Sequence, residues 1–311
     1  MELVRCLHNL QDRHKGCAIT IGNFDGVHAG HQAVIRELQQ FADKLDLPAV
    51  VVTFEPQPLE FFSPDKAPAR LTSFREKMEW LSEHGLDRVL CLRFQRSLTE
   101  MSAEDFINKI LVQGLGTKYI VVGDDFRFGK DRSGDFTFLQ SRQERYGYKV
   151  VSTNTLLVDG ERVSSSRIRK LLMAGMMDDA ATLLGRPYSM SGRVIHGDKR
   201  GRQLGFPTAN ISLKREKSPI LGVFAASVEG IGERTLTGVA NIGTRPVFYG
   251  HQVLLEVHVL DYQGDIYGRH LHINFHHKIR AEQKFETVDE LIKQIEKDIK
   301  KARNFFDKKI T

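Results

Sequence analysis

The chain has few cysteines, no long apolar segment and no large excess of one charge. Three cysteines occur among 311 residues, they form no Cys-x-x-Cys pair, and an odd number cannot pair completely. This pattern predicts buried thiols in a reducing compartment. No run approaches about 18 uninterrupted apolar residues, and residues 1–11 carry charges without an apolar stretch. We therefore expect a cytoplasmic protein with no signal peptide and no membrane partner.

The remaining composition is that of an ordinary globular protein, 41% hydrophobic and 27% charged. At about 150 residues per domain, the length predicts two domains. Lysine and arginine number 45 against 39 acidic residues, a net charge of +6. A mixed but slightly basic surface favours small anions such as nucleotides over DNA or RNA.

The first half of the chain alternates short apolar runs with amphipathic stretches. Such an order is typical of a doubly wound α/β fold with a parallel sheet, in which ligands bind beyond the carboxyl ends of the strands. The strand candidates are residues 18–21, 50–54, 89–92, 119–122 and 150–151. The helix candidates between them are residues 34–45, 73–84 and 103–113, where apolar positions recur three or four apart.

The second half begins where Arg186-Pro187 interrupts a helical pattern over residues 171–184. We therefore predict domains over residues 1–186 and 187–311. Closely spaced strands separated by turn signals predict a small antiparallel β-barrel or sandwich for the second domain. The strand candidates there are residues 188–195, 222–228, 235–242, 253–259 and 270–275.

The end of the chain predicts a helix over residues 287–306. Thr287 and Glu290 have the spacing of a capping box, in which each side chain accepts a hydrogen bond from the other residue's amide. Apolar residues then repeat at helical spacing as far as Phe306.

The segment Gly22–His31 follows the first predicted strand and precedes the first helix. Its glycines allow close approach of a ligand, and free amides at a helix start attract phosphate. His28 and His31 lie three residues apart, so both can donate to phosphate oxygens during phosphoryl or nucleotidyl transfer. The alternatives are a tight turn with two surface histidines, or a zinc site that adds Asp25.

The segment Gly192–Asn210 combines glycines with basic residues, which indicates a loop around phosphates. It lacks the Walker A pattern, and a simple turn before a strand is the alternative. Glu256 is a carboxylate in an otherwise apolar strand, where alternation places it with Leu254 and His258. On the residues alone, a half-exposed strand glutamate explains it as well as a functional carboxylate does.

These motifs carry a resemblance to a known family. Gly22–His31 resembles the His-x-Gly-His signature of the nucleotidyltransferases, and its longer form is similar to the adenylyltransferase half of bacterial bifunctional riboflavin kinase/FAD synthetases. Residues 53–58, 122–129 and 162–169 agree with that family, and Gly205–Asn210 resembles its flavokinase half. Gln57 stands where many relatives carry histidine, Asp125 where many have asparagine, and Ser166 where threonine is usual.

The resemblance implies that the first half binds ATP and FMN. The implied ATP contacts are Gly22, Asn23, Phe24, Asp25, His28, His31, Arg162, Ser165, Ser166 and Arg169. The implied flavin contacts are Phe54, Pro56, Phe62, Asp125 and Phe126. For Phe126 a place in the core is an equal alternative, and the segment 164–169 can also be a helix cap followed by solvated basic residues.

For the second half the resemblance implies a riboflavin kinase that uses Glu256 as its base. The implied ATP contacts are Gly192, Gly197, Lys199, Gly201, Gly205, Pro207, Thr208 and Asn210, with Thr208 and Asn210 also as Mg²⁺ ligands. The implied flavin contacts are Asn241, Arg280, Glu282 and Phe285. A kinase needs a base because a neutral alcohol must lose a proton, whereas a phosphate attacks as an anion.

The resulting hypothesis is an enzyme that phosphorylates riboflavin to FMN and adenylylates FMN to FAD, with Mg²⁺ and ATP in both steps. His28 and His31 are the candidate catalytic residues of the second reaction. We expect small-molecule substrates only, no nucleic-acid partner, and a monomer or weak oligomer. The alternative is a nucleotidyltransferase of another substrate whose barrel senses flavin or binds RNA.

Overall fold

The computed structural model of the protein describes residues 1–197, 201, 204–213, 215–247 and 250–310. The chain forms two compact units. The first unit contains Met1–Pro68 and Ser73–Ser164, and the second contains Ala69–Thr72 and Ser165–Thr311. The predicted functional boundary near Arg186 lies inside the second unit and remains a prediction.

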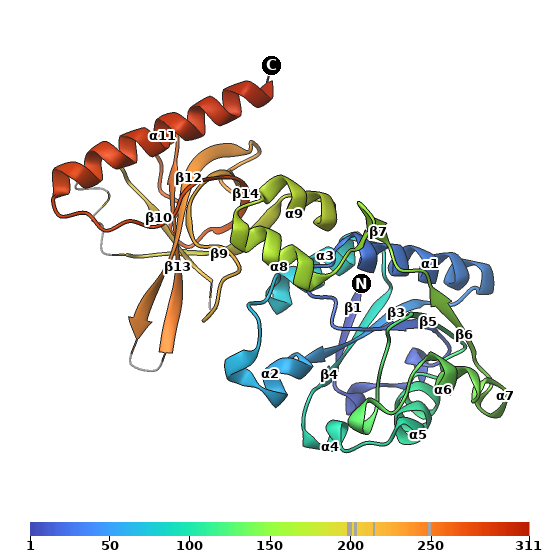
Figure 1. Ribbon diagram of the computed structural model, residues 1–311. Coiled ribbons are helices and arrows are strands. Elements are labelled where there is room, and N and C mark those ends of the chain that lie inside the picture. The colour runs from blue at the N-terminus through green and yellow to red at the C-terminus, as the bar shows by residue number, and fades with distance from the viewer. Residues whose placement is uncertain (198–200, 202–203, 214, 248–249, 311) are drawn as a thin grey trace. The chain divides into compact units, whose positions relative to one another are not determined.

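The first unit is built on a six-stranded sheet in the order β1-β4-β3-β2-β5-β6, and every neighbouring pair is parallel (Figure 1). The strands are β1 (Glu2–Arg5), β2 (Ala18–Ile21), β3 (Ala49–Glu55), β4 (Arg88–Arg93), β5 (Tyr119–Gly123) and β6 (Lys149–Thr153). The parallel α/β fold and its five predicted strands are confirmed. The edge strand β1 was not predicted.

Helices bury both faces of this sheet. Ile35 and Leu38 of α1 and Leu81 of α3 belong to one apolar cluster, and Ile107 and Leu111 of η4 belong to the cluster on the opposite face. The helical elements are α1 (Ala29–Leu45), α2 (Pro58–Phe62), α3 (Phe74–Glu83), α4 (Arg96–Thr99), α5 (Ala103–Asp105), the π-type η4 (Phe106–Gly114), α6 (Phe136–Gln140) and α7 (Gln143–Tyr146). Short 3₁₀ turns occur at η1 (Leu7–Asn9), η2 (Asp12–His14), η3 (Pro64–Lys66) and η5 (Lys130–Arg132).

The strand order reverses at the centre of the sheet. From β2 the chain continues to β3 on one side and later returns to β5 on the other side. In open parallel sheets, ligands bind at the carboxyl ends of the strands beside such a reversal. The loops that follow β2 and β5 begin at Gly22 and Asp124, so the fold brings two of the predicted motifs to this point.

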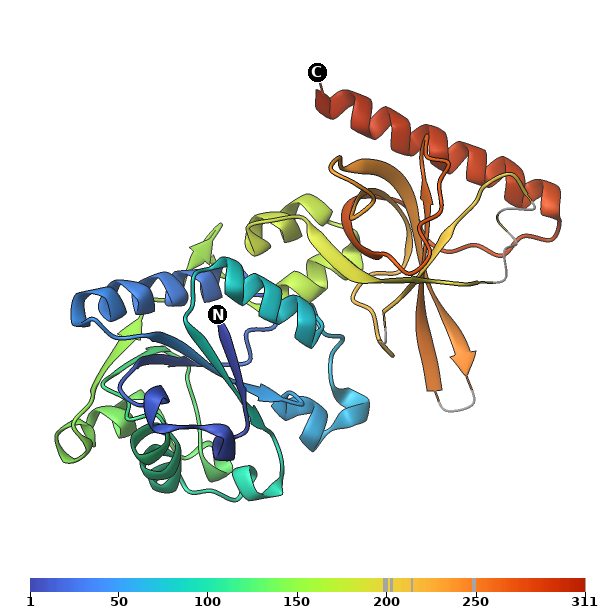
Figure 2. The same ribbon diagram turned by 180° about the vertical axis from the view of Figure 1, so that it is seen from behind.

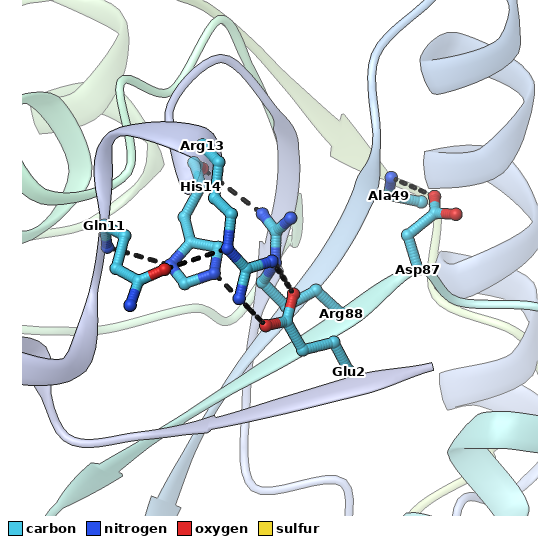
Figure 3. Close-up of polar contacts among 7 residues, drawn as sticks. All are labelled: Glu2, Gln11, Arg13, His14, Ala49, Asp87 and Arg88. Atoms are coloured by element: carbon cyan, nitrogen blue, oxygen red, sulfur yellow. Dashed lines mark hydrogen bonds and ion pairs between the residues drawn. The ribbon is translucent and has the colours of Figure 1, made fainter.

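A polar cluster joins β1 and η2 to β4 (Figure 3). Arg13 donates to both oxygens of Glu2, at 2.6 and 3.1 Å, and Arg88 donates to Glu2 at 3.2 Å. The buried His14 ring contacts Glu2 at 3.2 Å and accepts a hydrogen bond from the Gln11 amide at 2.9 Å. Because one carboxylate joins three side chains, the first segment of the chain is fixed to the sheet.

The second unit is a closed antiparallel barrel in the order β10-β13-β12-β11-β14-β9. Alternating apolar residues such as Ile211, Leu255 and Phe275 fill its interior. The strands are β9 (Tyr188–Ile195), β10 (Ala209–Ser212), β11 (Gly222–Glu229), β12 (Leu236–Val247), β13 (Gly250–Val259) and β14 (His270–Arg280). The predicted barrel and five of its strands are confirmed, and β10 is an addition.

The terminal helix α11 (Val288–Ile310) crosses the outside of the barrel, as both Figure 1 and Figure 2 show. It packs on β11, β12 and β14, which explains why β11 is buried on both faces. The Glu290 amide donates to Thr287 Oγ1 at 3.2 Å, as predicted, whereas the Glu290 carboxylate accepts from the Glu286 amide. Two further helices, α8 (Ser165–Ala174) and α9 (Met177–Leu184), belong to this unit, and α9 packs on β9 and β14.

Two expectations from the sequence concern the cysteines, expected to be buried thiols, and membrane-spanning segments, of which none was expected. Cys17 and Cys91 are buried free thiols, and burial raises their pKa values to about 12 and about 11, whereas Cys6 is only partly buried. Within the described part of the chain, no helix combines the length and apolar character that a bilayer span requires.

The Glu2 cluster predicts a pH-dependent contribution to stability. Hydrogen bonds, chiefly from Arg13 and then from Arg88 and His14, lower the pKa of Glu2 from 4.5 to about 2. Its contribution is therefore complete above pH 4.5 and is lost as the pH falls from 4.5 towards 2. Glu2→Gln should lower the urea midpoint at neutral pH, and the two proteins should converge in acid.

Urea titrations over a pH series measure this difference. Glu83→Gln, at an exposed position at the end of α3, provides the matched control and should leave the midpoint unchanged. A Glu2→Gln difference that stays constant down to the acid limit of the folded state would contradict the assignment.

Candidate active sites

The two histidines of the first motif stack on each other at the start of α1. Their ring centroids are 3.6 Å apart with an interplanar angle of 15°. His28 is the N-cap residue, and its Nδ1 accepts a hydrogen bond from the His31 amide at 3.3 Å. The Nδ1 atom of His31 is buried and has no hydrogen-bond partner among the described residues. A helix start with an unsatisfied imidazole nitrogen is suited to receive a phosphate oxygen.

The packing around the two histidines gives Gly30 and Phe24 of the motif a structural reason. A Cβ at Gly30 would lie 3.2 Å from the His28 ring, so the stacked arrangement leaves little room for a side chain there. Phe24 is 2% exposed and lies 4.9 Å from the His31 ring, measured between centroids. Its side chain therefore supports His31 from within the core, and Asp25 is also buried. Asn23 accepts a hydrogen bond from Thr53 through its backbone carbonyl.

A β-hairpin brings Arg162 to the loop after β5. The strands β7 (Leu157–Val158) and β8 (Glu161–Arg162) pair through Asp159-Gly160, and both turn residues have positive φ, as a tight hairpin requires. The Arg162 guanidinium contacts Asp125 at 2.7 Å and Asp124 at 3.8 Å. The hydrogen bond from Arg162 to Asp125 raises the pKa of the guanidinium, which keeps it charged. The acidic residue at position 125 therefore faces an arginine.

Positive charge gathers around His31. Lys77 on α3 is fully buried, and Lys77, Arg162 and His28 all act electrostatically on the His31 ring. Burial first, and then these three neighbours, lower the pKa of His31 well below its ordinary value. The ring is therefore neutral near pH 7, and the surrounding charges attract a polyanion.

Aromatic rings surround the carboxyl end of β3. Phe94 packs edge-on against Phe54, Phe61 and Phe62, with ring centroids 5.6 to 5.7 Å apart. Phe62 is 62% exposed, so part of this surface is open to a planar ligand. Gln57, two residues after β3, is buried, and its Nε2 has no hydrogen-bond partner among the described residues.

The remaining predicted residues of the first site lie in different surroundings. Phe126 is partly buried, packs against the apolar core and stacks on Phe128 at 5.4 Å. Ser165, Ser166 and Arg169 lie on α8 of the second unit, where Arg169 donates to the Ala69 carbonyl at 2.6 Å. The approach of these three residues to ATP remains a prediction.

In the barrel, Glu256 lies in a row of polar residues. The register places it opposite Asn210 of β10 and opposite Asn241 of β12, so the three share one face of the sheet. All three are partly exposed, whereas their sequence neighbours point into the apolar interior. The predicted alternation with Leu254 and His258 is confirmed. A carboxylate between two amides on the outer face can reach a substrate hydroxyl.

The glycine-rich segment approaches this row closely. A Cβ at Gly197 would overlap the side-chain amide of Asn210, and one at Gly201 would lie 3.0 Å from Thr208 Oγ1. These glycines therefore allow the segment to lie against the Thr208 and Asn210 side chains. The other predicted members of this group are Gly192 within β9, Gly205 with φ of 88°, and Lys199, which lies outside the described residues.

A cavity of about 540 Å³ lies beside Pro207 and Thr208. The loop after β13 also lines it and contributes Tyr262 and Tyr267. The His258 ring contacts the Pro207 carbonyl at 2.9 Å and thereby holds the predicted Gly205–Asn210 motif at the edge of this cavity. The size suits part of a nucleotide.

The predicted flavin contacts of the barrel lie at and beyond the end of β14. The Arg280 guanidinium lies 5.7 Å from the Phe285 ring centroid, and the Glu282 carboxylate lies where a Cβ on Gly243 would be. Arg280 is opposite Val223, and Val223 is opposite Asn241, so Arg280 continues the row that contains Glu256. The structure therefore brings these predicted residues to one region of the barrel.

A dedicated metal cluster finds no support in the residues whose placement is described. Among them, no group of three or more His, Cys, Asp or Glu side chains is arranged to hold an ion.

The fold and the two sets of residues define a nucleotidyltransferase-type α/β unit joined to a kinase-type β-barrel. Family models agree with this division, since residues 10–167 match FAD synthetase and residues 184–306 match riboflavin kinase. The chain belongs to the bifunctional riboflavin kinase/FMN adenylyltransferase family, as its sequence motifs predicted.

Full-length relatives support this membership. The bifunctional riboflavin kinase/FMN adenylyltransferase of Escherichia coli (strain K12) is 51% identical over 307 residues, which cover 98% of each chain. That of Pseudomonas fluorescens is 50% identical over 304 residues, covering 97% of each. A crystal structure described as that of a macrolide-efflux protein from Streptococcus pneumoniae matches with a TM-score of 0.83 and 29% identity, covering 98% of this chain and 99% of that one.

Two features of the sites were not found from the sequence. Lys77 occupies an ordinary position in an amphipathic helix pattern, and only its complete burial near His31 separates it from surface lysines. Tyr262 and Tyr267 lie in a connection between strands, and only the fold shows that they line the cavity. In both cases only the folded structure, and no sequence pattern, identifies the residues.

The electrostatics of the first site predict the titration of His31. Its imidazole C–H resonances, assigned by comparison with His31→Gln, should not move between about pH 7.5 and 5.5 in the ligand-free protein. Lys77→Met removes one neighbouring charge at similar side-chain length, so it should raise the midpoint towards this range. A wild-type midpoint near the usual value of 6.5 would contradict this description of the site.

Proposed function

We propose that the chain makes FAD in two ATP-dependent steps, phosphorylation of riboflavin at the barrel and adenylylation of FMN at the α/β unit. The observation that carries the proposal is the presence of two chemically different sites. One has stacked histidines at a helix start, and the other has a carboxylate in a row of amides. The family to which the chain belongs indicates the substrates.

In the adenylylation, an oxygen of the FMN phosphate attacks the α-phosphorus of ATP. The bond from this phosphorus to the oxygen bridging to the β-phosphate breaks, and pyrophosphate leaves with the electron pair. No base is required because the attacking phosphate is already an anion. His28 and His31 donate to oxygens whose charge grows in the transition state, and Arg162 stabilises the leaving pyrophosphate.

The open aromatic surface supports a place for the isoalloxazine ring of FMN in the first unit. Phe54 and Phe62 would contact the ring, with Pro56 beside them. Gln57 adds a buried amide donor that a flavin or phosphate oxygen would satisfy. The flavin contacts of Asp125 and Phe126 remain predictions, since Asp125 pairs with Arg162 and Phe126 packs on the core.

In the kinase step, the terminal hydroxyl of riboflavin loses its proton to Glu256 and attacks the γ-phosphorus of ATP. The bond from this phosphorus to the oxygen bridging to the β-phosphate breaks, and ADP leaves with the electron pair. Asn210 and Asn241 flank Glu256 and can orient the phosphate and the flavin. The cavity beside Pro207 and Thr208 supports a place for the adenosine part of ATP.

Mg²⁺ is the metal that fits this chemistry. In the barrel, Thr208 Oγ1 and the Asn210 amide oxygen are hard oxygen donors beside glycines that leave space for phosphates. Mg²⁺ keeps several waters and binds substrate phosphates, so a site with few protein ligands suits it. When bound, it neutralises phosphate charge and orients the transferred group.

The setting of these reactions is also part of the proposal. The free thiols Cys17 and Cys91 support a reducing, cytoplasmic location. Small molecules are sufficient partners for both sites, without nucleic acid or membrane. Activity as a monomer or weak oligomer is part of the same proposal.

Independent sites predict independent losses of activity. His28→Ala should lower FAD formation from supplied FMN by about 10²-fold or more, because a donor to the transition state is lost, while FMN formation persists. Glu256→Gln should lower FMN formation from riboflavin by about 10²-fold or more and leave FAD formation from FMN intact. Chromatography of the flavin products after incubation with Mg-ATP measures both.

Each variant is the matched control for the other. Loss of both activities in either folded variant would contradict the division of labour. Absence of ATP turnover in the wild-type protein, combined with salt-dependent binding of RNA, would instead favour a barrel that binds without catalysis.

A further inference from the structure

The terminal helix α11 carries a buried acidic residue on the face that packs against the barrel. Asp298 is 2% exposed. Its two carboxylate oxygens accept hydrogen bonds from Arg280 Nε at 2.9 and 3.1 Å, and Arg280 Nη2 approaches at 2.8 Å. Gln294, one helical turn earlier, donates to the same carboxylate at 2.8 Å. The ion pair is therefore buried and oriented by a third side chain.

Stability alone does not account for a buried pair of this kind. Removing two charges from water costs free energy that their attraction offsets only with good geometry, and well-packed apolar residues often serve as well. The same helix also carries an exposed ion pair. Arg303 donates to the two carboxylate oxygens of Asp261 at 2.7 and 2.8 Å at the surface. The buried pair adds a property that the surface pair lacks, a single fixed position for the Arg280 side chain.

Arg280 begins the segment that carries the predicted flavin contacts. Its Nη1 donates to the Ala281 carbonyl at 3.0 Å, and its guanidinium lies 5.7 Å from the Phe285 ring centroid. Because Nε and Nη2 face Asp298, the edge of the guanidinium is directed towards α11, which leaves its planar faces for aromatic contacts. Asn241 and Glu256 lie in the same row of the barrel.

We propose that Asp298 is a positioning residue for riboflavin. It fixes the plane of Arg280, and through it Phe285, so that the segment after β14 is already ordered when the flavin arrives. The inference rests on the proposed assignment of riboflavin phosphorylation to the barrel. Asp298 itself does not need to touch the substrate, since its oxygens receive Arg280 and Gln294. Its loss therefore weakens riboflavin binding and spares the chemical step.

The test compares Asp298→Asn with Asp261→Asn in the full chain. The first substitution keeps the side-chain volume and removes the charge that holds Arg280, and the second removes the acidic partner of the exposed pair. We expect Asp298→Asn to raise the KM for riboflavin about tenfold at saturating Mg-ATP, equivalent to about 1.4 kcal/mol of binding free energy. The kcat of the kinase, the KM for ATP and FAD formation from supplied FMN should change less than twofold, and Asp261→Asn should alter none of them.

A milder substitution tests the same idea if Asp298→Asn does not fold. Gln294→Met removes only the hydrogen bond that orients the Asp298 carboxylate, so it should raise the riboflavin KM two- to threefold in a folded protein. Thermal unfolding and the FMN adenylylation rate verify that each variant is intact.

The outcomes separate this inference from the proposed function. An unchanged riboflavin KM in folded Asp298→Asn, or in Gln294→Met where that variant replaces it, overturns the positioning role. Equal increases in the KM values for riboflavin and ATP, together with a lower unfolding temperature, also overturn it, because they indicate a purely structural pair. A wild-type protein that makes no FMN from riboflavin refutes the kinase assignment itself.

Discussion

The proposed adenylyltransferase site depends on one contact, the stacking of His28 on His31 at the start of α1. Gly30 leaves room for the His28 ring, and Phe24 supports His31 from the core. The stack keeps two imidazoles together where the helix start already attracts anions. Burial and neighbouring positive charge lower the pKa of His31 and keep it neutral, so the site avoids a further buried charge. Its Nδ1 is buried and has no partner among the described residues, and the proposed triphosphate would supply one.

The proposed kinase reaction at the barrel needs a base, and the barrel carries a carboxylate in a row of polar side chains. Its interior is filled by apolar side chains, so polar residues can lie only on the outer face of the strands or in the loops. Cross-strand register collects Asn210, Glu256 and Asn241 on that face without any of them being close in sequence. Helix α11 covers a neighbouring part of the outside, where Asp298 and Arg280 form their buried pair. The proposed proton acceptor and the segment proposed to contact the flavin are thus carried by one small barrel.

Much of the fold could be predicted because the buried strands of the first unit are continuous apolar runs, and barrel strands such as β9, β13 and β14 alternate. Strand β1 escaped detection because its four residues include Glu2 and Arg5, whose charges are exposed or paired with other elements. Strand β10 follows a segment of glycine and proline that indicates a turn. The sequence motifs indicated candidate residues for the chemistry, whose roles remain predictions, but they did not indicate the residues that contact these candidates. The burial of Lys77 and the pairing of Arg162 with Asp125 depend on elements far apart in the chain.

The pairing of Arg162 with Asp125 has a consequence for selectivity. An arginine with an acidic neighbour is already partly neutralised, so an incoming anion has to compete with that carboxylate for the guanidinium. A small anion such as chloride would contact only the guanidinium, whereas the proposed nucleoside triphosphate would bring several linked phosphates and would reach the histidines at the same time. With ATP bound as proposed, the Asp125 carboxylate therefore favours a multivalent anion over a small one.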